Sequence, residues 1–168
     1  MSEWFRLLTQ YLHVFTGILW LGGGFYAALV QLPALLSMPP QARGPASAQL
    51  APRQLRYILR VAEVTLATGI LNLFATGRAQ QFLQPFDQRW TIVLGIGIIM
   101  AFALYGIVRG QLVPLTNRML ALGPKAAGGD QAAAAEVGAI IERLKMLARV
   151  QIAIGALIIL AMVSARLS

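Results

Sequence analysis

The chain has 168 residues, of which 58% are hydrophobic and only 12% are charged, and its mean hydropathy is +0.68. About a quarter of the residues of a soluble domain are charged, so this composition excludes an ordinary soluble domain and indicates an integral membrane protein. The net charge of +8 comes from cations between apolar runs, a pattern typical of membrane-span flanks and not of a nucleic-acid interface. The chain has no cysteine, which excludes disulfides and thiolate metal sites.

Four apolar runs each approach the ~20 residues that cross a bilayer as a helix. In chain order they cover about 8–32, 57–77, 90–108 and 147–165. We therefore expect one all-α membrane domain over residues 1–168, a four-transmembrane-helix bundle whose main partner is the lipid bilayer. The remaining long segments, 33–56 and 109–146, are expected to be loops on one side of the membrane.

The two long connecting segments differ in composition. Residues 37–56 are rich in Pro, Ala and Ser, which indicates a loop rather than a packed element. In the second, GPKAAGG (123–129) is expected to break the chain after an extension of the third run, and Asp130 can cap a helix that continues into the fourth run. From Gln131 to Ala165 that helix would measure about 50 Å at 1.5 Å per residue, so we expect it to extend beyond the membrane.

The loop charges predict the orientation. The N-terminus, the second loop and the C-terminus hold four of the fourteen Lys and Arg residues, and the first and third loops with their span ends hold the other ten. Positively charged loops stay in the cytoplasm, so both termini are expected on the outer (periplasmic) side and the extension of the last helix in the cytoplasm. This predicts a protein of the bacterial cytoplasmic (inner) membrane.

His13, the only histidine of the chain, lies about five residues into the first run, roughly 7 Å below the outer boundary. Helical spacing predicts that it shares one face with Arg6, Gln10, Gly17, Trp20 and Gly24. Such a face can dock against a neighbouring helix or leave a slot for a flat ligand. A structural histidine would bond to Asn72 or a threonine hydroxyl across the bundle, whereas ionisable residues in spans are more often functional.

The second and fourth runs offer polar partners at this depth. One face of the second run carries Thr65, Gly69, Asn72 and Thr76, and Met162 lies at the same level in the fourth. Glu63 is the other intramembrane charge. Arg60 and Arg149 approach from the same side, which favours a structural ion pair over a proton relay.

The segment HVFTGILWLGGGFY, from His13 to Tyr26, resembles the first-span signature of HemJ-type protoporphyrinogen oxidases, roughly H-x6-W-x-[AG]-G-x-F-Y. It is also similar to the wider CopD-like group. HemJ-type proteins are four-helix membrane proteins in which this histidine is an axial ligand of haem b. They carry a histidine in the third span and an Asn-Glu pair early in the fourth, which this chain lacks. The resemblance therefore implies a haem ligand at His13 without the oxidase activity, and a copper role would need more ligands.

A haem b site needs an axial ligand, apolar walls and cations near the propionates. His13 would supply the ligand, Gly17 the space and Trp20 a wall, while Gln10, Asn72 or a backbone carbonyl would accept from the second ring nitrogen. The cations expected near the propionates are Arg6, Arg78 and Arg89. With one histidine per chain, the iron would be five-coordinate, bound by Met162, or shared between two His13 side chains in a homodimer.

Three functional hypotheses follow. In the first, the protein is a haem b membrane protein with an electron-transfer or redox role near the outer face, serving a redox partner in or at the membrane. If it is an enzyme, the resemblance implies a haem-dependent oxidoreductase. In the second, it is an accessory or assembly subunit in which His13 is only structural. In the third, it is a small transporter or channel subunit with a polar path along the second span.

Overall fold

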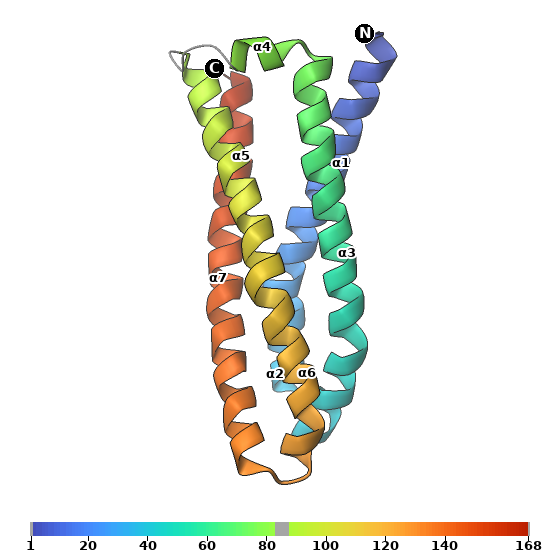
Figure 1. Ribbon diagram of the computed structural model, residues 1–168, viewed down its shortest axis with the longest axis vertical. Helices are drawn as coiled ribbons and strands as arrows, with labels where there is room; N and C mark the ends of the chain where they lie inside the picture. Colours follow the sequence, from blue (N-terminus) through green and yellow to red (C-terminus); the bar gives the residue numbers. More distant parts are fainter. Residues whose placement is uncertain (1, 83–87, 168) are drawn as a thin grey trace.

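The computed structural model describes residues 2–82 and 88–167, and this part of the chain is helical almost throughout (Figure 1). In chain order, its elements are α1 (Glu3–Tyr26), η1 (Ala27–Gln31), α2 (Leu32–Ser37), α3 (Pro40–Ala75), α4 (Arg78–Phe82), α5 (Arg89–Ile107), η2 (Val108–Leu112), α6 (Val113–Ala127) and α7 (Gln131–Leu167). Together they form four helical rods that are long and apolar enough to cross a membrane: Glu3–Ser37, Gln41–Ala75, Arg89–Ala127 and Gln131–Ala165. The predicted all-α class and the four potential spans are confirmed.

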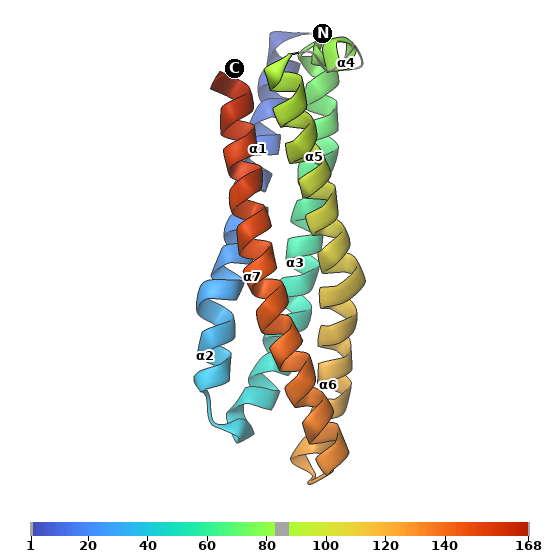
Figure 2. The ribbon, with the colours of Figure 1, turned by 90° about the vertical axis from the view of Figure 1, so that its left-hand side faces the viewer.

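The four rods alternate in direction. Both ends of the chain and α4 therefore lie at one end of the bundle, called the terminal end, and the α2–α3 and α6–α7 turns lie at the other, the hairpin end (Figures 1 and 2). α1 packs mainly on α3, and α5 and α6 pack on α7. The 37 residues of α7 measure about 55 Å at 1.5 Å per residue, against ~30 Å for the hydrocarbon core. The expected long extension of the last helix is thus present as a continuous rod.

Two of the rods contain a π-helical turn just before a proline. In η1 the Leu32 N–H donates to the carbonyl of Ala27, five residues back, and in η2 the Val113 N–H donates to that of Val108. Pro33 and Pro114 follow directly; a proline has no N–H, and its ring collides with the carbonyl four residues earlier. The wider turn accommodates the ring without ending the helix. The first rod therefore runs past Pro33, where the sequence predicted its end.

The predicted loop over residues 37–56 is wrong, because α3 begins at Pro40 and runs through Pro45 and Pro52. Pro40 stands in the first turn of the helix, where no N–H is needed. The turn before it is closed by Arg43, whose guanidinium donates to the carbonyls of Leu36 at 2.7 Å and Met38 at 3.0 Å. These bonds satisfy carbonyls at the end of α2, so a short turn replaces the expected loop.

Two predicted helix boundaries are confirmed. α3 ends at Ala75, and Gly77 follows with a positive φ of 72°, a conformation that glycine adopts without strain. At the other end of the bundle α6 ends at Ala127, and Gly129 has a φ of 94°. Asp130 then caps α7, since its carboxylate accepts from the Ala133 N–H at 3.0 Å. The break falls at the two glycines, and GPKAA (123–127) belongs to α6.

Two hydrophobic clusters hold the bundle together. The larger joins all four rods around Trp20, Leu104 and Val108, which are at most 3% exposed. The smaller packs α6 on α7 at the hairpin end around Leu122 and Ile140. Many other large apolar side chains face outward, as expected of a bundle surrounded by lipid.

Candidate functional site

His13 lies in the middle of the face that α1 turns toward the interior of the bundle, between the buried residues Thr9, Thr16 and Trp20. Its imidazole is half-buried and reaches α3, where Nδ1 lies 3.0 Å from the backbone carbonyl oxygen of Thr65. A carbonyl oxygen only accepts, so Nδ1 carries the proton and donates it. Nε2 is then the unprotonated nitrogen, and it has no hydrogen-bond partner among the described residues.

The imidazole of His13 packs against α3 at Gly69, where the helix has no side chain. A methyl group at this position would lie 2.8 Å from Cε1 and 3.0 Å from Nδ1 of His13, closer than real Cβ atoms come to their neighbours. Gly69 is also four residues after Thr65, so its missing side chain uncovers the Thr65 carbonyl on that side of the helix. The predicted stripe on the second span therefore does meet His13.

The acceptor is the backbone carbonyl, one of the three acceptors that the sequence left open, and neither Gln10 nor Asn72 takes that role. The threonine hydroxyls of this region donate within their own helices. Thr16 donates to Leu12 at 2.7 Å, and Thr65 donates to Val61 at 2.7 Å. The imidazole therefore bonds to a backbone carbonyl and not to a threonine hydroxyl, which was the structural alternative that the sequence suggested.

The predicted slot beside Gly17 is filled by protein. A methyl group at Gly17 would lie 3.7 Å from the Thr65 side chain, an ordinary van der Waals contact, so this part of α1 docks directly on α3. Trp20 belongs to the central core with Ile58, Leu104 and Ile158 and does not line a slot at His13. A macrocycle could lie only on the side of the imidazole turned away from α3.

Asn72 lies one turn from Gly69 toward the terminal end. Its Oδ1 is buried and has no hydrogen-bond partner in the described part of the chain. The oxygen and nitrogen of a side-chain amide exchange places on rotation, so the same position can present a donor. An unpaired buried amide is costly, and this one lies one turn from Gly69, which the imidazole contacts.

The three predicted arginines all lie at the terminal end, on α1, α4 and α5, and all three are exposed (Figure 1). Arg78 is engaged by Trp90, with its guanidinium carbon 5.6 Å from the centre of the indole ring. The indole N–H in turn donates to Gln88 at 2.6 Å. Arg6 and Arg89 form no side-chain hydrogen bond or ion pair with the described residues.

Met162 packs on α5 rather than toward His13. A methyl group at Gly97 would lie 2.9 Å from the Met162 methyl carbon and 3.9 Å from its sulfur. The side chain therefore fills the surface of α5 over this glycine and belongs to the central core. The structure does not bring the two predicted iron ligands together.

Glu63 does not form the predicted ion pair with Arg60 or Arg149. Its carboxylate accepts a hydrogen bond from the Tyr105 hydroxyl at 2.8 Å, which links α3 to α5. The ion pairs among the described residues lie at the hairpin end, Arg118 with Glu136 and Lys145 with Glu142. The intramembrane carboxylate thus has a neutral partner that no helical periodicity could identify.

The imidazole meets one requirement of an axial haem ligand. A metal-ligating histidine usually donates its other N–H to a carbonyl or a carboxylate, which fixes the tautomer and the ring orientation. The bond from Nδ1 to Thr65 does this and directs the lone pair to Nε2. No group of three or more His, Cys, Asp or Glu able to hold a metal ion occurs in the described ranges, so iron would be held by His13 and the macrocycle.

Comparisons of the chain with protein-family models, with curated proteins and with solved structures give no match. The likeness to HemJ-type proteins therefore rests on His13 to Tyr26 alone.

Proposed function

We propose that the protein is a membrane haem b protein in which Nε2 of His13 is the axial iron ligand. The observation that carries this proposal is the hydrogen bond from Nδ1 to the Thr65 carbonyl, which leaves Nε2 without a hydrogen-bond partner among the described residues. The haem would supply one-electron chemistry, and the protein would serve electron transfer or a redox reaction. A redox partner in or at the membrane would accept or provide the electron.

The surrounding residues suit defined parts of the group. Asn72, with its unpaired buried amide, would bond to a propionate. Arg6 and Arg89 would neutralise the propionates at the terminal end. The positive loops at the hairpin end favour placing the terminal end on the periplasmic side of a bacterial inner membrane. With Met162 on Gly97, the sixth position would stay open or be filled by His13 of a second copy.

One other function uses the same observation. In a non-enzymatic accessory or assembly subunit, the bond from His13 to Thr65 would serve only to hold α1 against α3. This alternative needs no chromophore, so an absorbance spectrum distinguishes the two.

The test is the spectrum of the protein purified in detergent from cells supplied with a haem precursor. We expect a Soret band in the wild type, its loss in His13→Ala, and its return when imidazole is added to that variant. Gln10→Ala, one turn away on α1, serves as the matched control and should keep the band. A colourless wild type, or a band that His13→Ala leaves unchanged, would show that the proposal is wrong.

A further inference from the structure

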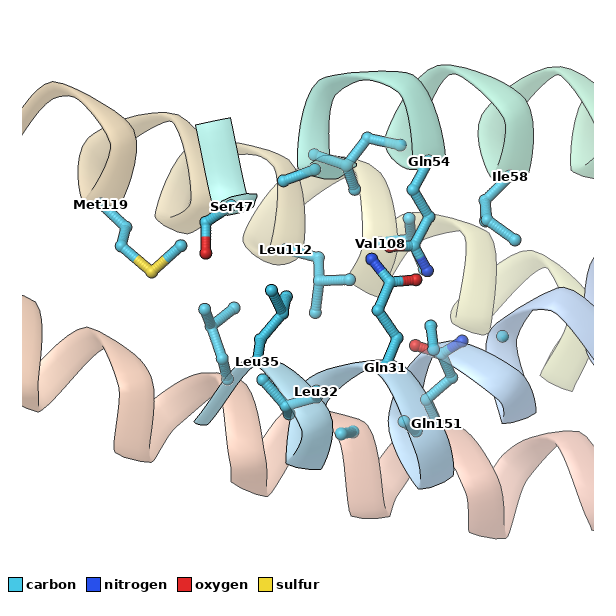
Figure 3. Close-up of a pocket in the computed structure, with 17 residues that line it drawn as sticks. Gln31, Leu32, Leu35, Ser47, Gln54, Ile58, Val108, Leu112, Met119 and Gln151 are labelled. Carbon is cyan, nitrogen blue, oxygen red and sulfur yellow. The ribbon is translucent and has the colours of Figure 1, made fainter. Parts of the chain in front are cut away.

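A cavity of about 130 Å³ lies in the half of the bundle nearer the hairpin end, away from His13 (Figure 3). All four rods contribute to its walls, and both π-helical turns line it, η1 with Gln31 and η2 with Val108 and Leu112. A cavity of ~150 Å³ in a protein core can hold a benzene molecule, and this one is close to that size, the size class of a single six-membered ring. None of its lining residues is Asp, Glu, Lys, Arg or His.

Three glutamine amides gather at one end of this cavity. Gln31 of η1, Gln54 of α3 and Gln151 of α7 project into the same region in Figure 3, and no described residue forms a hydrogen bond with any of them. Ser47, 9% exposed, lies toward the other end beside Met119. The walls between are aliphatic, for example Leu32. The three amides are half-buried and line the cavity, and a few convergent polar groups in an otherwise apolar pocket are typical of a ligand site.

A glycine and a π turn accommodate two of these amides. A methyl group at Gly24 would collide with the Gln151 amide, so glycine at this position is what lets the amide lie against α1. Gln31 is the last residue of η1, so the π turn itself carries one of the amides that line the cavity. Single π turns inside α-helices often occur at functional sites.

We propose that this cavity binds an uncharged planar ring with hydroxyl or carbonyl oxygens on its rim, the phenol and quinol class. The amide N–H groups donate to hydroxyl or carbonyl oxygens, the amide oxygens accept from hydroxyl groups, and the aliphatic walls cover the faces of the ring. An ionised ligand is disfavoured because no opposite charge lines the cavity to compensate its desolvation. This site is separate from the proposed haem site, and neither depends on the other.

The experiment measures binding of 4-fluorophenol to the purified full-length protein in lipid nanodiscs by fluorine NMR, with fluorobenzene as the apolar probe and 4-fluorobenzoate as the charged probe on the same ring. We expect specific, saturable binding of 4-fluorophenol, weaker binding of fluorobenzene, and no saturable binding of the charged 4-fluorobenzoate. Gln31→Leu and Gln54→Leu should each weaken 4-fluorophenol binding by about fivefold, the factor that one neutral hydrogen bond supports.

Gln111→Leu is the matched control, because this exposed glutamine lies in the other π turn and does not line the cavity. It should leave binding unchanged. Ala51→Leu fills the cavity while keeping the amides, and should abolish binding. The proposal is overturned if the wild type binds no 4-fluorophenol, if fluorobenzene binds equally well, or if the folded glutamine variants bind like the wild type. The wild-type comparison of the three probes decides the question even if a variant fails to fold.

Discussion

Replacing Gly69 with alanine tests the contact between His13 and α3. The new methyl group would lie 2.8 Å from Cε1 and 3.0 Å from Nδ1 of the imidazole, so the ring must move and its bond to the Thr65 carbonyl must lengthen or break. An interhelical hydrogen bond in a membrane contributes about 0.6–1 kcal/mol, and overpacking costs about 1–3 kcal/mol. Alanine is favoured over glycine in a helix by up to about 1 kcal/mol, which offsets part of this loss.

Gly17→Ala is the matched control. Its methyl group would meet the Thr65 side chain at 3.7 Å without strain, so this variant gains the same helix propensity and loses no contact. The propensity term cancels in the comparison, and we expect Gly69→Ala to be less stable than Gly17→Ala by about 2 kcal/mol. The measurement is the unfolding free energy of each protein in detergent, titrated with sodium dodecyl sulfate and followed by tryptophan fluorescence.

A double-mutant cycle then assigns the effect to the imidazole. In a His13→Ala background there is no ring for the new methyl group to meet, so Gly69→Ala should lose most of its cost. Residues in contact show such non-additivity, whereas distant residues do not. If Gly69→Ala were as stable as Gly17→Ala, or equally harmful with and without His13, the described contact would be wrong.

Three further substitutions test other contacts, two by the same unfolding measurement and one by amide hydrogen exchange. Tyr105→Phe should lower the unfolding free energy by about 0.5–1 kcal/mol, because the Tyr105 hydroxyl donates to Glu63 at 2.8 Å. The loss should be smaller in a Glu63→Ala background, where that bond is already absent. Additive effects of the two substitutions would contradict this bond. Asp130→Ala should destabilise α7 by about 1 kcal/mol, while Asp130→Asn, which can still accept from the Ala133 N–H, should not. Arg43→Met should speed amide hydrogen exchange across the α2–α3 turn, because the bonds to the Leu36 and Met38 carbonyls are lost. Arg43→Lys should keep part of the protection. Unchanged exchange in both variants would refute the capping role of Arg43.

The spans and several of their boundaries could be predicted because hydropathy and capping chemistry are local. An apolar run long enough to cross the bilayer remains helical whatever its neighbours are. Gly77 and Asp130 act through their own backbone conformation and side chain, and both lie where the sequence placed them. The same reasoning gave a wrong prediction for residues 37–56. Their prolines predict a loop, but the turn is closed by Arg43 reaching seven residues back to Leu36, a contact that composition does not reveal.

The π turns limit sequence reasoning in a different way. Pro33 predicts that the regular hydrogen bonding of the first rod is interrupted, but a helix can respond by ending, by kinking or by forming a wider turn. Gln31 lies inside the widened turn, so its position depends on a choice that the local sequence leaves open. The cavity and its amides were therefore beyond the reach of helical periodicity, although Gln151 stands out as a polar residue in an apolar run.

His13 lies on the face of α1 that also holds the buried Thr9, Thr16 and Trp20, and its partner is a backbone atom. Carbonyl groups are present at every residue, and only a nearby glycine such as Gly69 signals that one of them is accessible. The choice between a structural and a haem-binding histidine then depends on Nε2. Holding α1 against α3 needs a single donor, which the O–H of a serine or the N–H of an asparagine would supply. A histidine also brings a second ring nitrogen, and Nε2 has no hydrogen-bond partner among the described residues. Coordination of iron would use that nitrogen, and for this reason we favour the haem.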